Sequence, residues 1–263
     1  SVRWRGTVDL DAIGSVADVP CGGLAHVDGT ISAPTYTNPR IVARGTRIEG
    51  FRFLEIDLGN AAADVLYGPD FLVRIQDGQG VKGQTRYHGE GVVDLEPSPP
   101  RVLSSRFEAE GRVKDLLDAV RDWVPSTRML RDRFDGDVQV SGTATGKAGF
   151  LDGTFEGRLG TGTLFGRPFD SGRAAGTFEN GASARLDRAE LRRGPGAVRW
   201  SGWWGFQDPV PWDLEVSFAG LPLDGLELPG GGWAGSASGT ARLEGSFDHP
   251  DVRFAGNGDG VSF

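Results

Sequence analysis

The sequence has few of the residues on which disulfide scaffolds, metal sites and membrane helices depend. It contains one cysteine, Cys21, which excludes an intramolecular disulfide and a metal site built from Cys-x-x-Cys pairs. The three histidines, His26, His88 and His249, are far apart in segments that we expect to form different hairpins. No apolar run reaches the roughly 18 residues that a membrane-spanning helix needs. We therefore predict no metal and no cofactor.

Positive charge is scarce as well. The chain has 28 Lys and Arg against 36 Asp and Glu, so its formal net charge is −8. A protein with this balance has no general electrostatic attraction to the phosphates of nucleic acid. Nucleic acid is therefore not predicted as a partner.

Glycine is abundant, with 42 of 263 residues, and apolar residues alternate with polar ones over many short runs. Alternation at period two predicts strands with one apolar and one wet face. The richest example predicts a strand over 198–206, a turn at Asp208-Pro209, and a second strand over 212–218. A similar pattern, strand, turn and strand, ends the chain between Ser238 and Phe263. The composition therefore predicts a mostly β protein made of hairpins.

One segment instead has helical spacing. Apolar residues recur three and four positions apart between Val113 and Val124, and Pro125 follows. We expect one short amphipathic helix here, within a connector of strand and helix over 101–136. The connector joins a β-sheet segment over 1–100 to a second one over 137–263. The chain begins at Ser1 and ends at Phe263 within strand patterns, so we expect a piece of a longer protein.

No catalytic motif is visible. Gly78 to Gly83 fits the spacing Gly-x-Gly-x-x-Gly, but a strand pattern follows it where a nucleotide-binding loop would open a helix. We expect a hairpin turn there, with Asp77 to Gly80 joining two strands. Acidic residues are spread over the polar strand faces and turns, and no pair is singled out for acid–base catalysis. The protein is not predicted to be an enzyme.

The apolar strand face has two possible structural roles. It could meet a second sheet in a β-sandwich, or it could line an open groove formed by one long curled antiparallel sheet. Many short hairpins, little helix and no long crossovers favour the long sheet. The residues predicted to line such a groove are Val138, Val140, Trp200, Trp204, Phe206, Trp212, Leu214, Val216, Phe218, Leu243, Val252 and Phe254.

Three stretches carry a family resemblance: 137–146 (DVQVSGTATG), 219–223 (AGLPL) and 239–254 (GTARLEGSFDHPDVRF). In combination and order they resemble the AsmA-like family of Gram-negative envelopes, and more closely its TamB-like branch. The resemblance implies a long, twisted, U-shaped (taco-like) sheet that conducts the acyl chains of phospholipids across the periplasm. It also implies an inner-membrane anchor before this segment and an outer-membrane barrel partner engaged by a region after it. The family has no catalytic residues to transfer.

The leading hypothesis is therefore a mid-chain section of a periplasmic lipid-transfer bridge. Three alternatives stay open. The first is a structural or adhesive β-domain that binds glycan or protein, with Trp203 on its outer face. The second is a glycosidase with two carboxylates on facing strands. The third is a factor that assists outer-membrane protein assembly on the same architecture.

Overall fold

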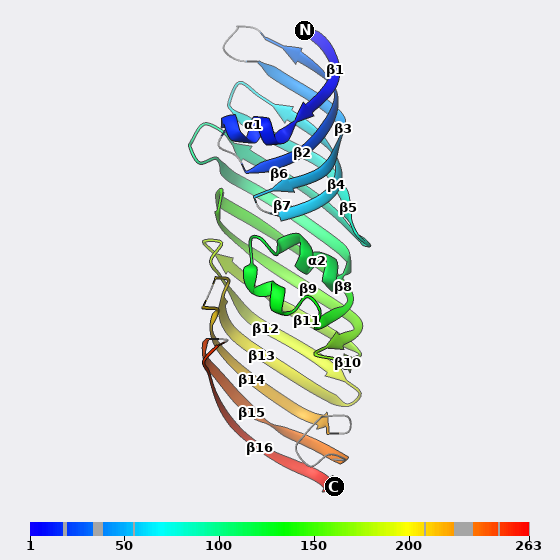
Figure 1. The fold of residues 1–263 in the computed structure, drawn as a ribbon, viewed down its shortest axis with the longest axis vertical. Helices are drawn as coiled ribbons and strands as arrows, with labels where there is room; N and C mark the ends of the chain where they lie inside the picture. The colour runs from blue at the N-terminus through cyan, green and yellow to red at the C-terminus, as the bar shows by residue number, and fades with distance from the viewer. Residues whose placement is uncertain are drawn as a thin grey trace.

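The chain forms one open antiparallel sheet (Figure 1). The computed structural model describes residues 1–17, 20–33, 39–54, 56–207, 209–223, 234–246 and 248–262. Over these residues the strand order follows the sequence from β1 to β16, and only β10 leaves this path, because it pairs with β9 alone. The strands follow one another side by side along the long axis of the molecule, with the N-terminus at one end and the C-terminus at the other. The predicted long sheet is thus confirmed, and the alternative β-sandwich is wrong.

The sheet passes through all three predicted segments without a break. Its strands are β1 Val2–Asp9, β2 Cys21–Ser32, β3 Arg40–Phe53, β4 Ile56–Tyr67, β5 Leu72–Lys82, β6 Thr85–Asp94, β7 Arg101–Arg112, β8 Phe134–Lys147, β9 Phe150–Leu164, β10 Arg167–Phe169, β11 Ser171–Glu179, β12 Ser183–Arg193, β13 Gly196–Gly205, β14 Pro211–Pro222, β15 Ala234–Ser246 and β16 Pro250–Ser262. The helices are α1 Leu10–Ala17, α2 Val113–Val120 and the 3-10 turn η1 Pro125–Met129.

One glycine-rich junction differs from its prediction. The expected turn at Asp77–Gly80 lies inside β5, where the pairing with β6 shifts between Ile75 and Gly78. Gln76 and Asp77, the two residues between these positions, form a bulge, and Asp77 adopts a φ of 50°. The turn between β5 and β6 comes later, at Gly83, which has a φ of 59°.

One face of the sheet is apolar from the first strand to the last. Residues opposite each other on paired antiparallel strands point to the same face. One such row links Trp4, Gly29, Ala43, Val65 and Ile75 across β1 to β5. We call this the inner face, and the opposite, charged face the outer face.

The middle of the inner face is covered by the chain that connects β7 to β8. α2 begins directly after β7, and η1 follows Val124. The indole of Trp123 packs edge-on against Phe178, with ring centroids 5.5 Å apart, and against Phe206 at 5.9 Å. Val124 is buried in the same cluster as Val102, on β7. The predicted helix is therefore present but ends at Val120, and it covers the sheet.

The helix α1 was not predicted, because the alternation of apolar residues from Val2 through Val8 to Leu10 is a strand pattern. Asp9 accepts a hydrogen bond from the backbone N–H of Asp11 at 3.0 Å, which satisfies one of the free N–H groups of the first helical turn. Leu10 packs against a second cluster on β2 and β3, formed by Ala25, Val27, Ala43 and Ile48. The inner face is thus covered by α2 and η1 at the first apolar cluster and by α1 at the second.

Candidate functional site

The predicted groove residues lie on one face of the sheet. On the C-terminal strands, Trp200 pairs with Val216, and that row continues through Ala241 to Phe254. A neighbouring row joins Leu214, Leu243 and Val252. Val138 and Val140 belong to the same face through their pairing with Leu159 and Gly157 on β9. The alternating pattern therefore placed these side chains correctly relative to one another.

The cover over this face divides the predicted residues into two groups. Phe206 follows β13 and is 4% exposed, and its carbonyl accepts a hydrogen bond from the N–H of Ser126 at 3.3 Å. Val138 is also buried, on a strand that α2 contacts. These two side chains belong to the protein's own core. Trp204 stands at the boundary, half-buried beside Phe206.

The second group lies toward the C-terminal end. Trp200, Trp212, Leu214, Val216, Phe218 and Leu243 are half-buried. Val252 and Phe254 are 56% and 67% exposed on the edge strand β16. The rings of Phe218 and Phe254 stack with centroids 5.6 Å apart and an interplanar angle of 9°. An apolar wall of this extent, exposed to water, is typical of a surface that receives an apolar partner.

No family model, curated protein or solved structure matches the chain. The geometry of the two sheet faces is therefore the basis for assigning a function.

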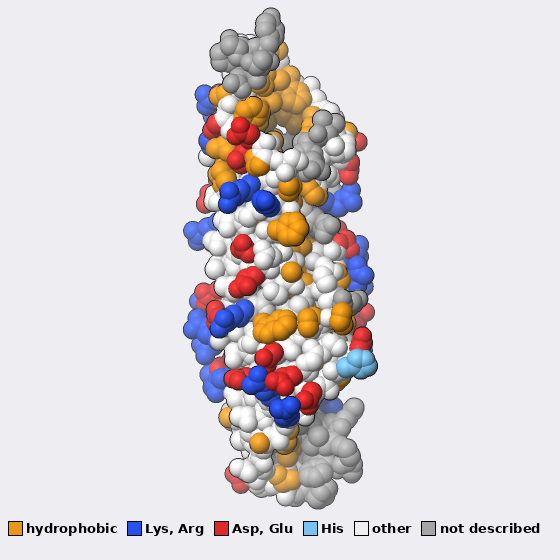
Figure 2. Space-filling view, turned by 90° about the vertical axis from the view of Figure 1, so that its left-hand side faces the viewer, with side chains coloured by type: hydrophobic (Ala, Val, Ile, Leu, Met, Phe, Trp, Pro, Cys, Tyr) orange, Lys and Arg blue, Asp and Glu red, His pale blue; other side chains and the backbone are white. Residues whose placement is uncertain are grey.

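The N-terminal half contributes to the same apolar face and was left out of the predicted lining. Trp4 and Val8 on β1 pack against the cluster that contains Ala25 and Val27. Figure 2 shows hydrophobic side chains around a hollow near this end, and an interrupted row of them farther along, flanked by charged side chains. The alternation of Val2, Trp4 and Val8 was the signal that could have identified them.

The acidic and basic groups lie mainly on the outer face. Glu190 on β12 is 6% exposed and contacts Arg192 and Arg199, whose hydrogen bonds lower the pKa of its carboxyl group to about 2. A carboxyl group with this pKa stays ionised near neutral pH and is a poor general acid. Within the part of the chain that the structure describes, no group of three or more His, Cys, Asp or Glu side chains could hold a metal ion.

Two further observations concern the alternatives. Trp203 lies on the outer face and is 42% exposed, as the adhesive alternative predicts for this residue. That alternative also predicts a closed core, whereas the sheet is open. None of the described helices is both long and apolar enough to cross a bilayer.

Proposed function

We propose that this chain is a section of a lipid-transfer bridge of the AsmA-like and TamB-like kind. The apolar inner face would shield the acyl chains of phospholipids from water, while the headgroups stay hydrated. The observation that carries the proposal is the apolar inner face of one open sheet, which the α2–η1 connector covers in the middle and which is half-exposed as an aromatic wall on β13 to β16. Passage would be passive, without a catalytic step.

The energetics of such a face suit transfer. Each Å² of apolar surface removed from water contributes about 25 cal/mol. The binding free energy of an acyl chain therefore grows with the length of the chain that lies against the inner face. These contacts have no preferred direction, and a chain can slide from one set of side chains to the next. A few strong polar contacts would instead hold the lipid in place.

The cellular setting of the proposal comes from the family resemblance. The resemblance implies a location in the periplasm, attachment to the inner membrane through a segment outside this sequence, and an outer-membrane barrel protein as a partner. Assistance to outer-membrane protein assembly uses the same architecture, and it would retain the apolar face as a surface for unfolded strands.

The test is native mass spectrometry of the purified chain, with extraction and identification of the lipids that it carries. The decisive variant is Phe218→Glu, which puts a charge on the inner face, and its control is Ala219→Glu, at the next residue, which is exposed on the outer face of the same strand. Because Phe254 is 67% exposed, Phe254→Glu repeats the test with little risk to folding. We expect phospholipid to copurify with the wild type and with Ala219→Glu, and to be lost from both inner-face variants.

Far-UV circular dichroism checks that each variant keeps its sheet. A wild-type chain that purifies without lipid and also takes up no fluorescent phospholipid would refute the proposal. Glycan and protein screens would then test the adhesive alternative, beginning with a Trp203→Ala variant.

A further inference from the structure

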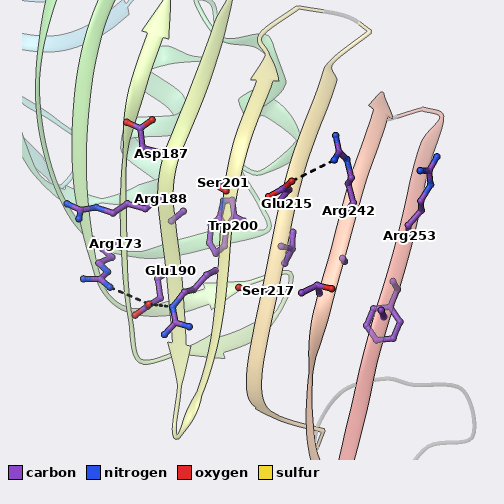
Figure 3. A pocket seen from close by; sticks show the side chains of 17 residues that line it. Arg173, Asp187, Arg188, Glu190, Trp200, Ser201, Glu215, Ser217, Arg242 and Arg253 are labelled. Atoms are coloured by element: carbon purple, nitrogen blue, oxygen red, sulfur yellow. Dashed lines mark hydrogen bonds and ion pairs between the residues drawn. The ribbon is translucent and has the colours of Figure 1, made fainter.

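The outer face carries an open hollow of about 630 Å³ over strands β11 to β16, on the opposite side of the sheet from the apolar wall. Figure 3 shows the charged side chains that line it, with Arg173 and Arg188 at one end and Arg242 and Arg253 at the other. This concentration of arginine is unexpected in a chain with a net charge of −8. The two ends of the hollow differ in how far their arginines are neutralised.

At the C-terminal end, acidic side chains neutralise the arginines. Arg242 contacts Glu244 at 2.6 Å and Asp213 at 3.2 Å, and Arg253 contacts Asp251 at 3.1 Å. An additional anion would meet these carboxylates. This end is therefore an ordinary surface network of ion pairs.

At the other end, one carboxylate serves three arginines. Glu190 contacts Arg192 Nε at 2.5 Å, Arg199 Nε at 2.6 Å and Arg173 Nη2 at 3.4 Å. The Glu190 side chain is 6% exposed, whereas the arginines are 54% to 59% exposed. The carboxylate of Glu190 neutralises one of the three positive charges. Because it is buried beneath the arginine side chains, it also fixes the positions of their guanidinium groups.

A fourth arginine, Arg188, lies on the same face of β12 as Glu190, two residues earlier and next to an irregularity in the strand. The pairing of β12 with β13 shifts between Leu186 and Ala189, and the two residues between them, Asp187 and Arg188, are both exposed. Bulges of this kind redirect side chains. Arg188 lines the hollow and also an adjoining one of about 340 Å³, and within the described part of the chain its side chain has no hydrogen bond or ion pair.

We propose that Arg173, Arg188 and Arg199 form a binding site for a phosphate group on the outer face. Guanidinium groups bind phosphate oxygens through pairs of parallel N–H donors. Arg199 donates to Glu190 through Nε, so its two terminal nitrogens can donate to a phosphate. The phosphate supplies the negative charge that Glu190 alone does not. It belongs either to a lipid headgroup or to a soluble phosphate compound. The proposal does not depend on lipid transfer along the inner face.

The test measures binding in two arms at low ionic strength. Isothermal titration calorimetry with inorganic phosphate and with pyrophosphate tests a soluble ligand. Sedimentation with phosphatidylcholine vesicles, with and without phosphatidylglycerol, tests a headgroup. Saturable binding in the first arm assigns a soluble phosphate, and binding that requires phosphatidylglycerol in the second assigns a headgroup.

Variants connect the binding to the site. Arg188→Gln removes a side chain that has no partner in the described structure, so the fold is expected to persist, and binding is expected to weaken about tenfold, the effect of one good charge-assisted contact. Arg185→Gln is the control, because Arg185 lies on the same strand, is 71% exposed and does not line the hollow. The proposal is overturned if neither arm shows saturable binding, or if Arg185→Gln weakens binding as much as Arg188→Gln does. Because both variants leave the inner face intact, a loss in one alone cannot come from a failure of lipid loading.

Discussion

Replacing Trp123 by alanine tests whether the α2–η1 connector is fixed to the inner face. The indole makes two edge-on aromatic contacts, with Phe178 at 88° and with Phe206 at 70° between ring planes. Each such pair contributes about 0.5–1.5 kcal/mol beyond the burial of its area. Removal of a core aromatic side chain costs about 3–5 kcal/mol, and because Trp123 is only half-buried we expect about 3 kcal/mol.

The assay is urea unfolding followed by far-UV circular dichroism, with hydrogen exchange over residues 113–133 as a local measurement. Trp203→Ala is the matched control, because this tryptophan is 42% exposed on the outer face. Its loss is expected to cost less than about 1 kcal/mol. Equal effects of the two variants, or unchanged exchange over the connector in Trp123→Ala, would refute the claim that the connector is fixed by this ring.

Two further predictions concern single positions in the sheet. Because the folded-state pKa of Glu190 is lowered to about 2, its ionised form stabilises the fold above the usual pKa of 4.5, and this contribution is lost as the pH falls toward 2. The advantage of the wild type over Glu190→Gln in urea unfolding should therefore shrink between these pH values, and a constant difference would contradict this. A Cβ on Gly153 would lie 2.1 Å from the carbonyl oxygen of Thr143 and 2.2 Å from the ring of Phe178. Gly153→Ala is expected to lower the free energy of unfolding by about 1–3 kcal/mol, whereas Gly157→Ala on the same strand, with its nearest atom 3.8 Å away, should change it little; similar values for the two would show that this packing is not the cause.

The sequence was most informative about which side chains share a face. The strands expected over 198–206 and 212–218 do pair, with Trp204 opposite Trp212. A strand's side chains alternate strictly, so the apolar pattern determines the face, and an antiparallel hairpin preserves it across the turn. At the other end of the sheet, the alternation of Val2, Trp4 and Val8 on β1 also indicates which side chains share a face. Trp4 could therefore have been included in the predicted lining.

The features that escaped prediction depend on contacts between distant segments. Nothing in the alternation distinguishes Phe206, which Trp123 covers, from Phe218, which it does not. The stretch Asp77–Gly80 has turn composition, yet Gly78 lies opposite Gly89 on the next strand, and the extended pairing prevails. In the sequence, Glu190 is one of many acidic residues on a polar strand face. Its arginine partners come from three different strands, so the cluster forms only when these strands pair.

The order of the sheet has a consequence for how such a protein is made and how it can evolve. Apart from the small β10, each described strand pairs only with its neighbours along the path, and these are near neighbours in sequence. Contacts between near neighbours form quickly, and each hairpin can join the growing edge as soon as it has been synthesised. Because a new hairpin displaces no existing pair, duplication of one would lengthen the molecule by a fixed step. Its length is therefore a quantity that selection can adjust one hairpin at a time.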